Sequence, residues 1–311
     1  MYKLMTNVFN TILTIISLFV FTSCDKQSDQ EKTYRINGTL TVDGRARTYL
    51  LNLPPGYYES DTMLPLVIGL HGTGGSATQF EHDYSFTDKA NSAGFIAVYP
   101  EGVRSTGILG LRTWNAGTCC DFALEQGIDD VKYIRTLLDK LVTSYKVNAK
   151  RVYVTGMSNG GMLTYRLASE MPDRIAAVAV VSCSMMLPAP LAPSRPMPIL
   201  HIHSTLDTKI PYVGGIGIGG YYFPPVDSVH RVWAQHNGCA TTPTILTDDN
   251  RYQLTEWPGC GTGAVIRRYL TRDGGHAWPG GLKSNRRGDE PSTVINATDL
   301  IWDFFKGYSL P

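Results

Sequence analysis

The sequence has almost no net charge, because its 28 Lys and Arg residues are nearly balanced by 27 Asp and Glu residues. Charged residues make up 18% of the 311 positions, and the formal net charge is +1. Binding to nucleic acid or to an anionic membrane surface through electrostatics requires a basic excess, which is missing here. The hydrophobic fraction of 43% is that of an ordinary globular core. The composition therefore predicts a globular protein without a nucleic-acid partner.

The sequence also lacks an internal repeat and a long low-complexity linker. Repeat arrays and multidomain chains usually show one or the other. We therefore expect a single domain from residue 33 to residue 311.

A hydrophobic run long enough for a comfortable membrane span is missing near the N-terminus. Residues 11–21 are apolar but fall short of the roughly 20 residues that a spanning helix needs. They end in small residues before Cys24, and a polar stretch follows. Residues 1–24 thus resemble a bacterial lipoprotein signal with Cys24 as the lipidated residue; the alternative is a cleaved secretory peptide with an incidental cysteine. Either reading predicts a secreted protein or an outer-surface lipoprotein of a bacterium, in contact with membrane only through an N-terminal lipid.

Five further cysteines can form disulfides if the chain leaves the cytoplasm. Cys239 and Cys260 close a loop of modest length and are the first pair that we expect. One of Cys119 and Cys120 is a candidate partner for Cys183. The odd number leaves one thiol unpaired.

Short apolar runs recur along the chain and predict a buried sheet. Residues 34–53 alternate between apolar and polar around Asp43 and Gly44, a pattern typical of a hairpin. Continuous apolar runs then follow, as expected of strands that are buried on both faces. These runs cover residues 64–70, 95–99, 152–154, 176–181, 199–203 and 265–270.

Helical patterns lie between these runs. Residues 130–147 and 161–171 place apolar side chains at steps of three and four. Buried strands that alternate with amphipathic helices predict an α/β fold with a mostly parallel sheet covered on both sides. Residues 104–127 and 212–225 show neither pattern and are expected to form long loops, which often carry function.

Ser158 stands in the run Gly-Met-Ser-Asn-Gly at residues 156–160, between a predicted strand and a predicted helix. Gly-x-Ser-x-Gly at such a junction is the nucleophile elbow of the α/β-hydrolase fold. Its glycines permit a sharp turn that exposes the serine at the sheet edge, beside a helix N-terminus. The alternative is a glycine-rich turn with a capping serine.

A serine hydroxyl becomes a good nucleophile only when a base takes its proton and a third group orients that base. The chain order in this fold is serine, acid, histidine, each after a strand. Asp207 and His276 occupy such positions and are the predicted acid and base. Asp227 and Asp273 are rival acids, each also explained as a plain loop carboxylate.

A reaction of this kind needs two backbone donors for the negatively charged oxygen of its intermediate. The amide of Asn159, directly after the serine, is one expected donor. The other is the amide of Thr73, in the run His-Gly-Thr-Gly-Gly at residues 71–75. His71 is expected to brace this loop.

His201 and His203 alternate on one predicted strand, and a His-x-His pair can bind zinc. Further ligands are not clustered around them in the sequence, and both lie where a core strand is expected. We therefore predict no metal site and no cofactor.

With these residues in place, the chain resembles the esterase family that groups poly(3-hydroxybutyrate) depolymerases with feruloyl and acetylxylan esterases, known as carbohydrate esterase family one. The resemblance extends from about residue 45 to residue 282 and is specific because several motifs occur together. The motifs lie at residues 70–75, 127–131, 151–162, 203–207, 233–239 and 275–280.

The resemblance implies an α/β-hydrolase fold with Ser158, Asp207 and His276 as a catalytic triad. It also implies the Cys239–Cys260 disulfide, and that Trp114 and Trp278 bind substrate near an acyl or sugar pocket. Residues 214–223, rich in glycine and aromatics, are less typical of the family and bear on substrate specificity.

The sequence as a whole predicts a secreted serine carboxylic ester hydrolase. Its expected substrate is a feruloyl or acetyl ester on plant cell-wall polysaccharide, because of the family resemblance and of aromatic-rich loops able to stack on a ring or a sugar. Poly(3-hydroxybutyrate) hydrolysis is the alternative within the same chemistry. A non-catalytic, glycan-binding surface lipoprotein is the alternative of another class.

Overall fold

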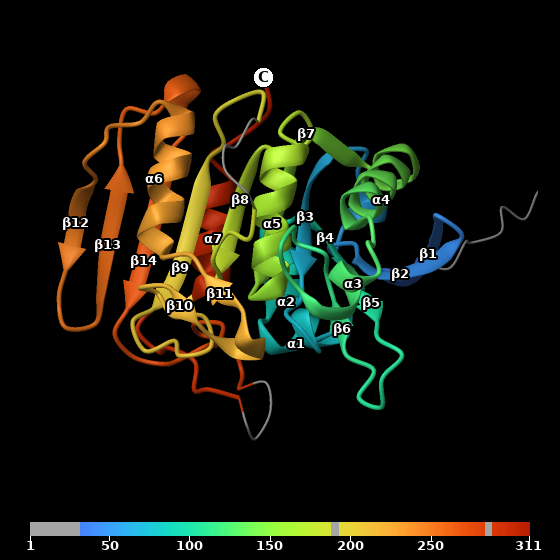
Figure 1. Cartoon of the computed structure of the whole chain (residues 1–311). Coiled ribbons are helices and arrows are strands. Elements are labelled where there is room, and N and C mark those ends of the chain that lie inside the picture. Colours follow the sequence, from blue (N-terminus) through green and yellow to red (C-terminus); the bar gives the residue numbers. More distant parts are fainter. Residues whose placement is uncertain (1–31, 188–192, 284–287) are drawn as a thin grey trace, which may run out of the picture. The chain divides into compact units, whose positions relative to one another are not determined.

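Ten strands of the described chain form one sheet in the computed structural model of the protein (Figure 1). The structure describes residues 32–187, 193–283 and 288–311, so the predicted signal with Cys24 lies outside the described residues. Thr33–Pro311 form one compact unit. None of the helices in the described ranges has the length and apolar character needed to cross a bilayer.

The centre of the sheet is parallel, as the sequence predicted. Each central strand covers one of the predicted apolar runs; only β7 is much longer than expected, because polar residues at its start obscure the apolar pattern. In spatial order the central strands are β4 (Ile96–Pro100), β3 (Leu64–Leu70), β7 (Val147–Met157), β8 (Ala177–Val181), β9 (Ile199–Ser204) and β14 (Ile266–Thr271).

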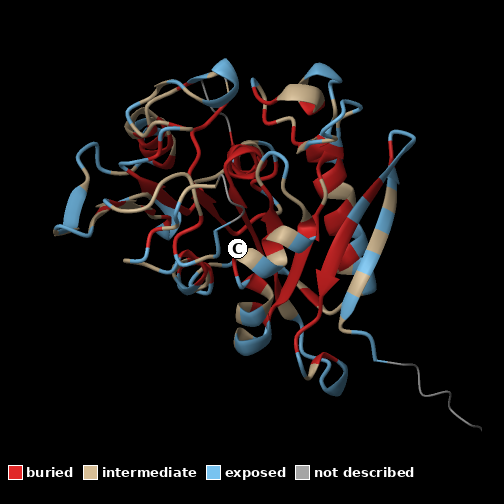
Figure 2. Ribbon diagram, turned by 90° about the horizontal axis from the view of Figure 1, so that it is seen from below, coloured by how far each residue is buried: buried red, intermediate tan, exposed pale blue. Residues whose placement is uncertain are grey.

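Antiparallel hairpins form both edges of the sheet. β1 (Arg35–Val42) and β2 (Arg45–Asn52) are the predicted hairpin, and β2 pairs with β4. At the other edge, β13 (Tyr252–Trp257) and β12 (Thr244–Asp248) extend from β14. The central strands are buried, whereas the outermost strands carry many exposed residues (Figure 2).

Helices cover both faces of the sheet (Figure 1). Successive residues of each central strand point to opposite faces, so that Ile68 joins one apolar core and Val67 the other. The first core packs under α4 (Asp130–Ser144), α5 (Asn159–Glu170) and α6 (Val226–Asn237). The second packs under α1 (Ala77–Asp83), α2 (Phe86–Ala93) and α7 (Ala297–Phe305).

Short elements occupy the two segments that were expected to be irregular. The first contains β5 (Val103–Arg104), β6 (Arg112–Thr113) and α3 (Asp121–Glu125). The second contains β10 (Gly215–Ile216), β11 (Tyr222–Phe223) and the 3-10 turn Ile218–Gly220. Two further 3-10 turns, Tyr57–Glu59 and Gly261–Gly263, lie elsewhere in the described chain. Both predicted loops are therefore more ordered than expected.

The cysteine pairing confirms one expectation and corrects another. Cys239 and Cys260 form a disulfide, as expected. Cys119 and Cys120 bond to each other, so neither pairs with Cys183. Cys183 is a free, buried thiol because its side chain packs against the start of α5, where a Cβ on Gly161 would lie 2.7 Å from its Sγ.

Candidate active site

Ser158 occupies a sharp turn between β7 and α5. Its backbone has φ 55° and ψ −122°, a region that residues with side chains rarely adopt. A Cβ on Gly156 would lie 2.4 Å from the carbonyl carbon of Gly160, and a Cβ on Gly160 would lie 2.1 Å from the carbonyl oxygen of Leu70. The two glycines are therefore required by the close approach of strand and helix at the elbow.

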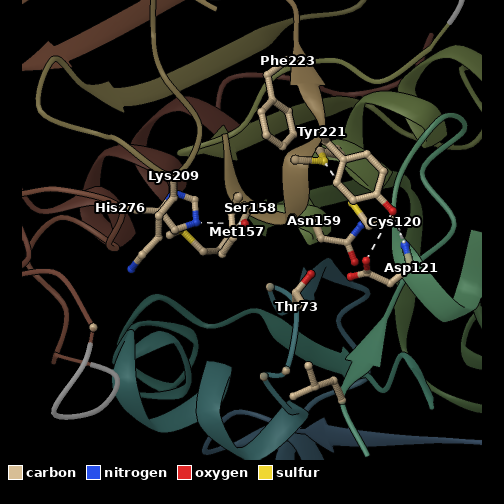
Figure 3. Close-up of a pocket in the computed structure, with 18 of the residues that line it drawn as sticks. Thr73, Cys120, Asp121, Met157, Ser158, Asn159, Lys209, Tyr221, Phe223 and His276 are labelled. Atoms are coloured by element: carbon tan, nitrogen blue, oxygen red, sulfur yellow. Dashed lines mark hydrogen bonds between the residues drawn. The ribbon is translucent and has the colours of Figure 1, made fainter. Parts of the chain in front are cut away.

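His276 and Asp207 form an unbroken hydrogen-bond chain with Ser158. The distance from His276 Nε2 to Ser158 Oγ is 2.9 Å, and from His276 Nδ1 to Asp207 Oδ2 it is 2.8 Å (Figure 3 shows the first of these). Since Asp207 accepts at Nδ1, that nitrogen carries the proton and Nε2 is free to accept one from the serine. The structure thus brings together three residues that follow β7, β9 and β14.

The Asp207 carboxylate is buried and fully bonded. Its Oδ1 accepts from the amides of Lys209 at 3.0 Å and Ile210 at 2.9 Å, and its side chain is shielded from solvent. Burial by itself would raise the pKa of the Asp207 carboxyl. The hydrogen bond from His276, the neighbouring imidazoles and the Ile210 amide outweigh it, so the pKa of Asp207 lies below its ordinary value. Asp207 is therefore held as an anion beside His276.

The two rival acids have other partners. Asp227 binds Arg268 Nη1 at 2.6 Å. Asp273 accepts from Ser292 Oγ at 2.6 Å and from the Thr293 amide at 2.9 Å. In the described part of the chain neither carboxylate is bonded to His276, so Asp207 is the acid that the geometry selects.

The amides of Thr73 and Asn159 border the same space as Ser158. Asn159 is the first residue of α5, so its amide has no acceptor within the helix. Thr73 lies in a turn closed by the Gly75 amide and the Gly72 carbonyl at 3.0 Å. Within the described ranges neither Thr73 nor Asn159 has a hydrogen-bond acceptor for its backbone amide. Both amides are thus free to donate to an anionic oxygen near Ser158.

His71 braces the loop that carries Thr73, as expected. Its Nδ1 donates to the Gly72 carbonyl at 2.7 Å, and its Nε2 accepts from the Gly102 amide at 3.0 Å. Complete burial lowers the pKa of His71 to about 4, so the imidazole is neutral and can play both parts.

The two tryptophans that were expected to bind substrate are core residues instead. Trp114 is 0% exposed and Trp278 is 1% exposed, and neither borders the cavity. Trp278 stacks on Tyr84 with a centroid distance of 4.4 Å, while Trp114 Nε1 donates to the His71 carbonyl at 2.9 Å. Their large rings fill the space beneath the site loops, which removes them from any substrate.

A cavity of about 560 Å³ opens over Ser158, and the two long loops form part of its lining (Figure 3). Its size is that of an ordinary small-molecule site. Tyr221 donates to Asp121 Oδ1 at 3.3 Å and accepts from the Asp121 amide at 2.9 Å, which joins the two loops across the cavity. The lining residues other than glycine are Thr73, Gln79, Tyr84, Leu111, Cys120, Asp121, Met157, Ser158, Asn159, Met162, Lys209, Ile218, Tyr221, Phe223 and His276.

Sequence reasoning did not select Asp289, which also holds the site together. Its Oδ2 accepts from the backbone amide of His276 at 2.8 Å, and its Oδ1 binds Lys209 Nζ at 3.1 Å. Asp289 thereby ties the loop of His276 to the loop of Asp207. It lies in no recognisable motif, so only the fold reveals it.

The chain is similar in sequence to known esterases. The family described as Esterase PHB depolymerase matches residues 47–208. The chain is 29% identical over 85% of its length to feruloyl esterase B of Piromyces equi, of which it spans 46%. It is 28% identical over 79% of its length to the bifunctional acetylxylan esterase/xylanase XynS20E of Neocallimastix patriciarum, of which it spans 31%. It therefore spans less than half of either relative.

The fold has solved counterparts. An acetyl xylan esterase from Aspergillus awamori superposes with a TM-score of 0.61 over 87% of this chain and 99% of that chain, at 15% sequence identity. The α/β-hydrolase fold with a mostly parallel central sheet is thereby confirmed.

Proposed function

The chain belongs to the Esterase PHB depolymerase family, and on that premise we propose that it hydrolyses carboxylic esters through a covalent acyl-enzyme on Ser158. The observation that carries the proposal is the hydrogen-bond chain from Ser158 through His276 to Asp207 at the floor of an open cavity. A poised serine, a base and an oriented acid are the parts that acyl transfer requires.

The first half-reaction forms the acyl-enzyme. His276 Nε2 takes the Ser158 proton as Oγ attacks the ester carbonyl carbon, and Asp207 stabilises the imidazolium that results. The amides of Thr73 and Asn159 donate to the oxyanion. His276 then gives its proton to the departing alcohol oxygen.

The second half-reaction releases the acid. His276 takes a proton from water, the hydroxide oxygen attacks the acyl carbon, and the same two amides hold the second oxyanion. Ser158 leaves as the alkoxide and regains its proton from His276. All proton transfers take place between groups of the chain, the ester and water.

We propose feruloyl or acetyl esters on plant cell-wall polysaccharide as the substrates. Two relatives are named for feruloyl and acetylxylan ester hydrolysis. Tyr84, Tyr221 and Phe223 line the cavity, and aromatic walls suit a phenolic acyl group or a sugar ring. Poly(3-hydroxybutyrate) is the second candidate, since the family description names its depolymerase.

We propose that the protein acts outside the cytoplasm. The basis is the lipoprotein-like signal at residues 1–24, with Cys24 as the lipidation site. Globomycin treatment, which blocks lipoprotein signal cleavage, should cause the uncleaved precursor to accumulate, and Cys24→Ser should abolish labelling by a palmitate analogue. Unchanged labelling of Cys24→Ser would contradict the proposal that Cys24 carries a lipid anchor.

A fluorophosphonate probe and a substrate panel test the chemistry. The probe should label the wild-type chain and spare Ser158→Ala, and ester hydrolysis should fall by on the order of 10⁴-fold in the same variant. A chain that binds xylan but takes no label would instead be a non-catalytic glycan-binding protein. Release of ferulate and acetate should exceed release of 3-hydroxybutyrate from matched esters; the reverse order would replace the substrate proposal and keep the triad.

A further inference from the structure

A second hydrogen-bond chain runs from α5 to the Ile210 carbonyl and passes within 3.5 Å of the Asp207 carboxylate. It begins at Tyr165 on α5, whose hydroxyl lies 2.8 Å from His201 Nδ1. His201 Nε2 lies 3.2 Å from His203 Nδ1. His203 Nε2 lies 2.9 Å from the Ile210 carbonyl and 3.5 Å from Asp207 Oδ2, the same oxygen that His276 binds.

The proton positions along this chain follow from chemistry. The Ile210 carbonyl can only accept, so His203 Nε2 must carry a hydrogen. Burial lowers the pKa values of His201 and His203, and both imidazoles are therefore neutral. A neutral His203 has a bare Nδ1, so His201 donates to it from Nε2, and Tyr165 in turn donates to the bare Nδ1 of His201.

Every hydrogen bond of the chain therefore points in one direction, from Tyr165 through His201 and His203 to the Ile210 carbonyl. Aligned hydrogen bonds polarise one another in a dry interior, which strengthens the last donor. The three side chains are no more than 1% exposed, so solvent does not weaken this effect. These two histidines, which could have formed a zinc pair by sequence, are each other's partners instead.

We propose that His203 is a positioning residue. Its Nε2–H, polarised by the Tyr165–His201–His203 chain, stabilises the negative charge of the Asp207 carboxylate and holds that group in place. This inference rests on the proposed triad. The Asp207 carboxylate then has three hydrogen-bond donors, and His203 Nε2 lies 3.5 Å from Oδ2, so that the carboxylate is held against rotation when His276 becomes charged. His203 is also one of the neighbours that lower the pKa of the Asp207 carboxyl.

The other ionisable groups around this chain keep one charge state near neutral pH. Burial raises the pKa of the Cys183 thiol and of the Tyr212 hydroxyl, and it lowers the pKa of His230 on α6. Arg268 on β14 is paired with Asp227, and Asp289 is paired with Lys209. A change in the pH–rate profile when His203 is replaced therefore does not come from these groups.

The test compares pH profiles of kcat/KM on 4-nitrophenyl acetate. His203→Phe keeps the ring and removes the donor; its kcat should fall about tenfold, and its acid limb should move to higher pH by about half a unit. His203→Gln retains an N–H at the same end and should shift the limb less. His82→Gln, at an exposed imidazole, is the control and should match the wild type.

A folded His203→Phe with the wild-type acid limb and kcat would overturn the inference. If that variant does not fold, ¹⁵N spectra of the wild-type histidines decide: His201 and His203 should both be neutral and protonated at Nε2 from pH 5 to 9. A charged imidazole, or a proton on Nδ1, at either His201 or His203 would overturn the inference. Ser158→Ala separates the two proposals. If that variant keeps its activity, the proposed triad is wrong. If Ser158→Ala is inactive and His203→Phe matches the wild type, only the proposed role of His203 is wrong.

Discussion

Asn159 and Trp114 hold one another through a pair of hydrogen bonds. The Trp114 amide donates to Asn159 Oδ1 at 2.7 Å, and Asn159 Nδ2 donates to the Trp114 carbonyl at 3.0 Å. The indole of Trp114 reaches onward to the His71 carbonyl. Trp114 thus links the start of α5, which carries the Asn159 amide, to the loop that carries the Thr73 amide. These two amides are the proposed oxyanion donors.

Removing the indole donor should therefore loosen the oxyanion site. Trp114→Phe leaves the buried His71 carbonyl without its partner, at a cost of about 1–3 kcal/mol in the free energy of unfolding. We expect kcat/KM to fall about tenfold as the loop shifts. Trp233→Phe is the matched control, since Trp233 is equally buried but its Nε1 has no partner among the described residues. It should lose some stability and keep kcat; a similar loss of kcat in both variants would mean that Trp114 only fills space.

The close packing at the elbow predicts that Gly160 tolerates no side chain. A methyl group there would meet the Leu70 backbone, which cannot move away, so Gly160→Ala should destabilise the fold by about 3 kcal/mol or more. Gly107→Ala is the control, because the nearest atom to its Cβ position is 4.0 Å away. Urea unfolding of the two variants measures the difference. Equal midpoints would show that the elbow can relax.

Buried neutral histidines predict that stability falls in acid. Burial lowers the pKa of His230 far below its unfolded value of about 6.5. Below pH 6.5 the unfolded chain therefore binds a proton that the folded chain excludes, and the free energy of unfolding decreases by about 1.4 kcal/mol per pH unit for each such histidine. His71, His201 and His203 act in the same direction.

His230→Phe isolates one of these contributions. Both ring nitrogens of His230 lack partners in the described structure, so the substitution breaks no hydrogen bond. Denaturant unfolding at pH 7, 6 and 5 should give a slope shallower by about 1.4 kcal/mol per pH unit than in the wild type. His82→Phe, at an exposed ring, should keep the wild-type slope. An unchanged slope in His230→Phe would contradict the prediction. It would mean that a bound water or a charge at that site offsets the effect of burial on the pKa of His230.

The cavity wall predicts which residue discriminates between acyl groups. Phe223 is buried and lines the cavity, so Phe223→Ala should raise KM for a feruloyl ester about tenfold and leave KM for an acetyl ester nearly unchanged. Tyr222→Ala, at the exposed neighbour outside the cavity, should change neither constant. Equal effects of Phe223→Ala on both esters would mean that the acyl group binds elsewhere.

Local sequence patterns were sufficient to predict the central strands of the sheet and the turn at Ser158. The elbow at Ser158 combines a short motif with a strand before it and a helix after it, and the order of Asp207 and His276 follows from the chain. The edge strand β12 was missed because its side chains are largely exposed, and β13 was missed because its half-buried residues are mostly polar. The burial of Trp114 depends on contacts with residues far away in the sequence, such as His71 and Asn159, which no local pattern records.

The order of strands in the sheet gives this chemistry a built-in safeguard. Ser158, Asp207 and His276 follow β7, β9 and β14, with β8 between the first two strands and 118 positions between the serine and the histidine. A nascent or partly unfolded chain has all three side chains and no site. The proposed hydrolase would therefore be inert during synthesis, and recovery of ester hydrolysis after denaturation would report completion of the whole sheet.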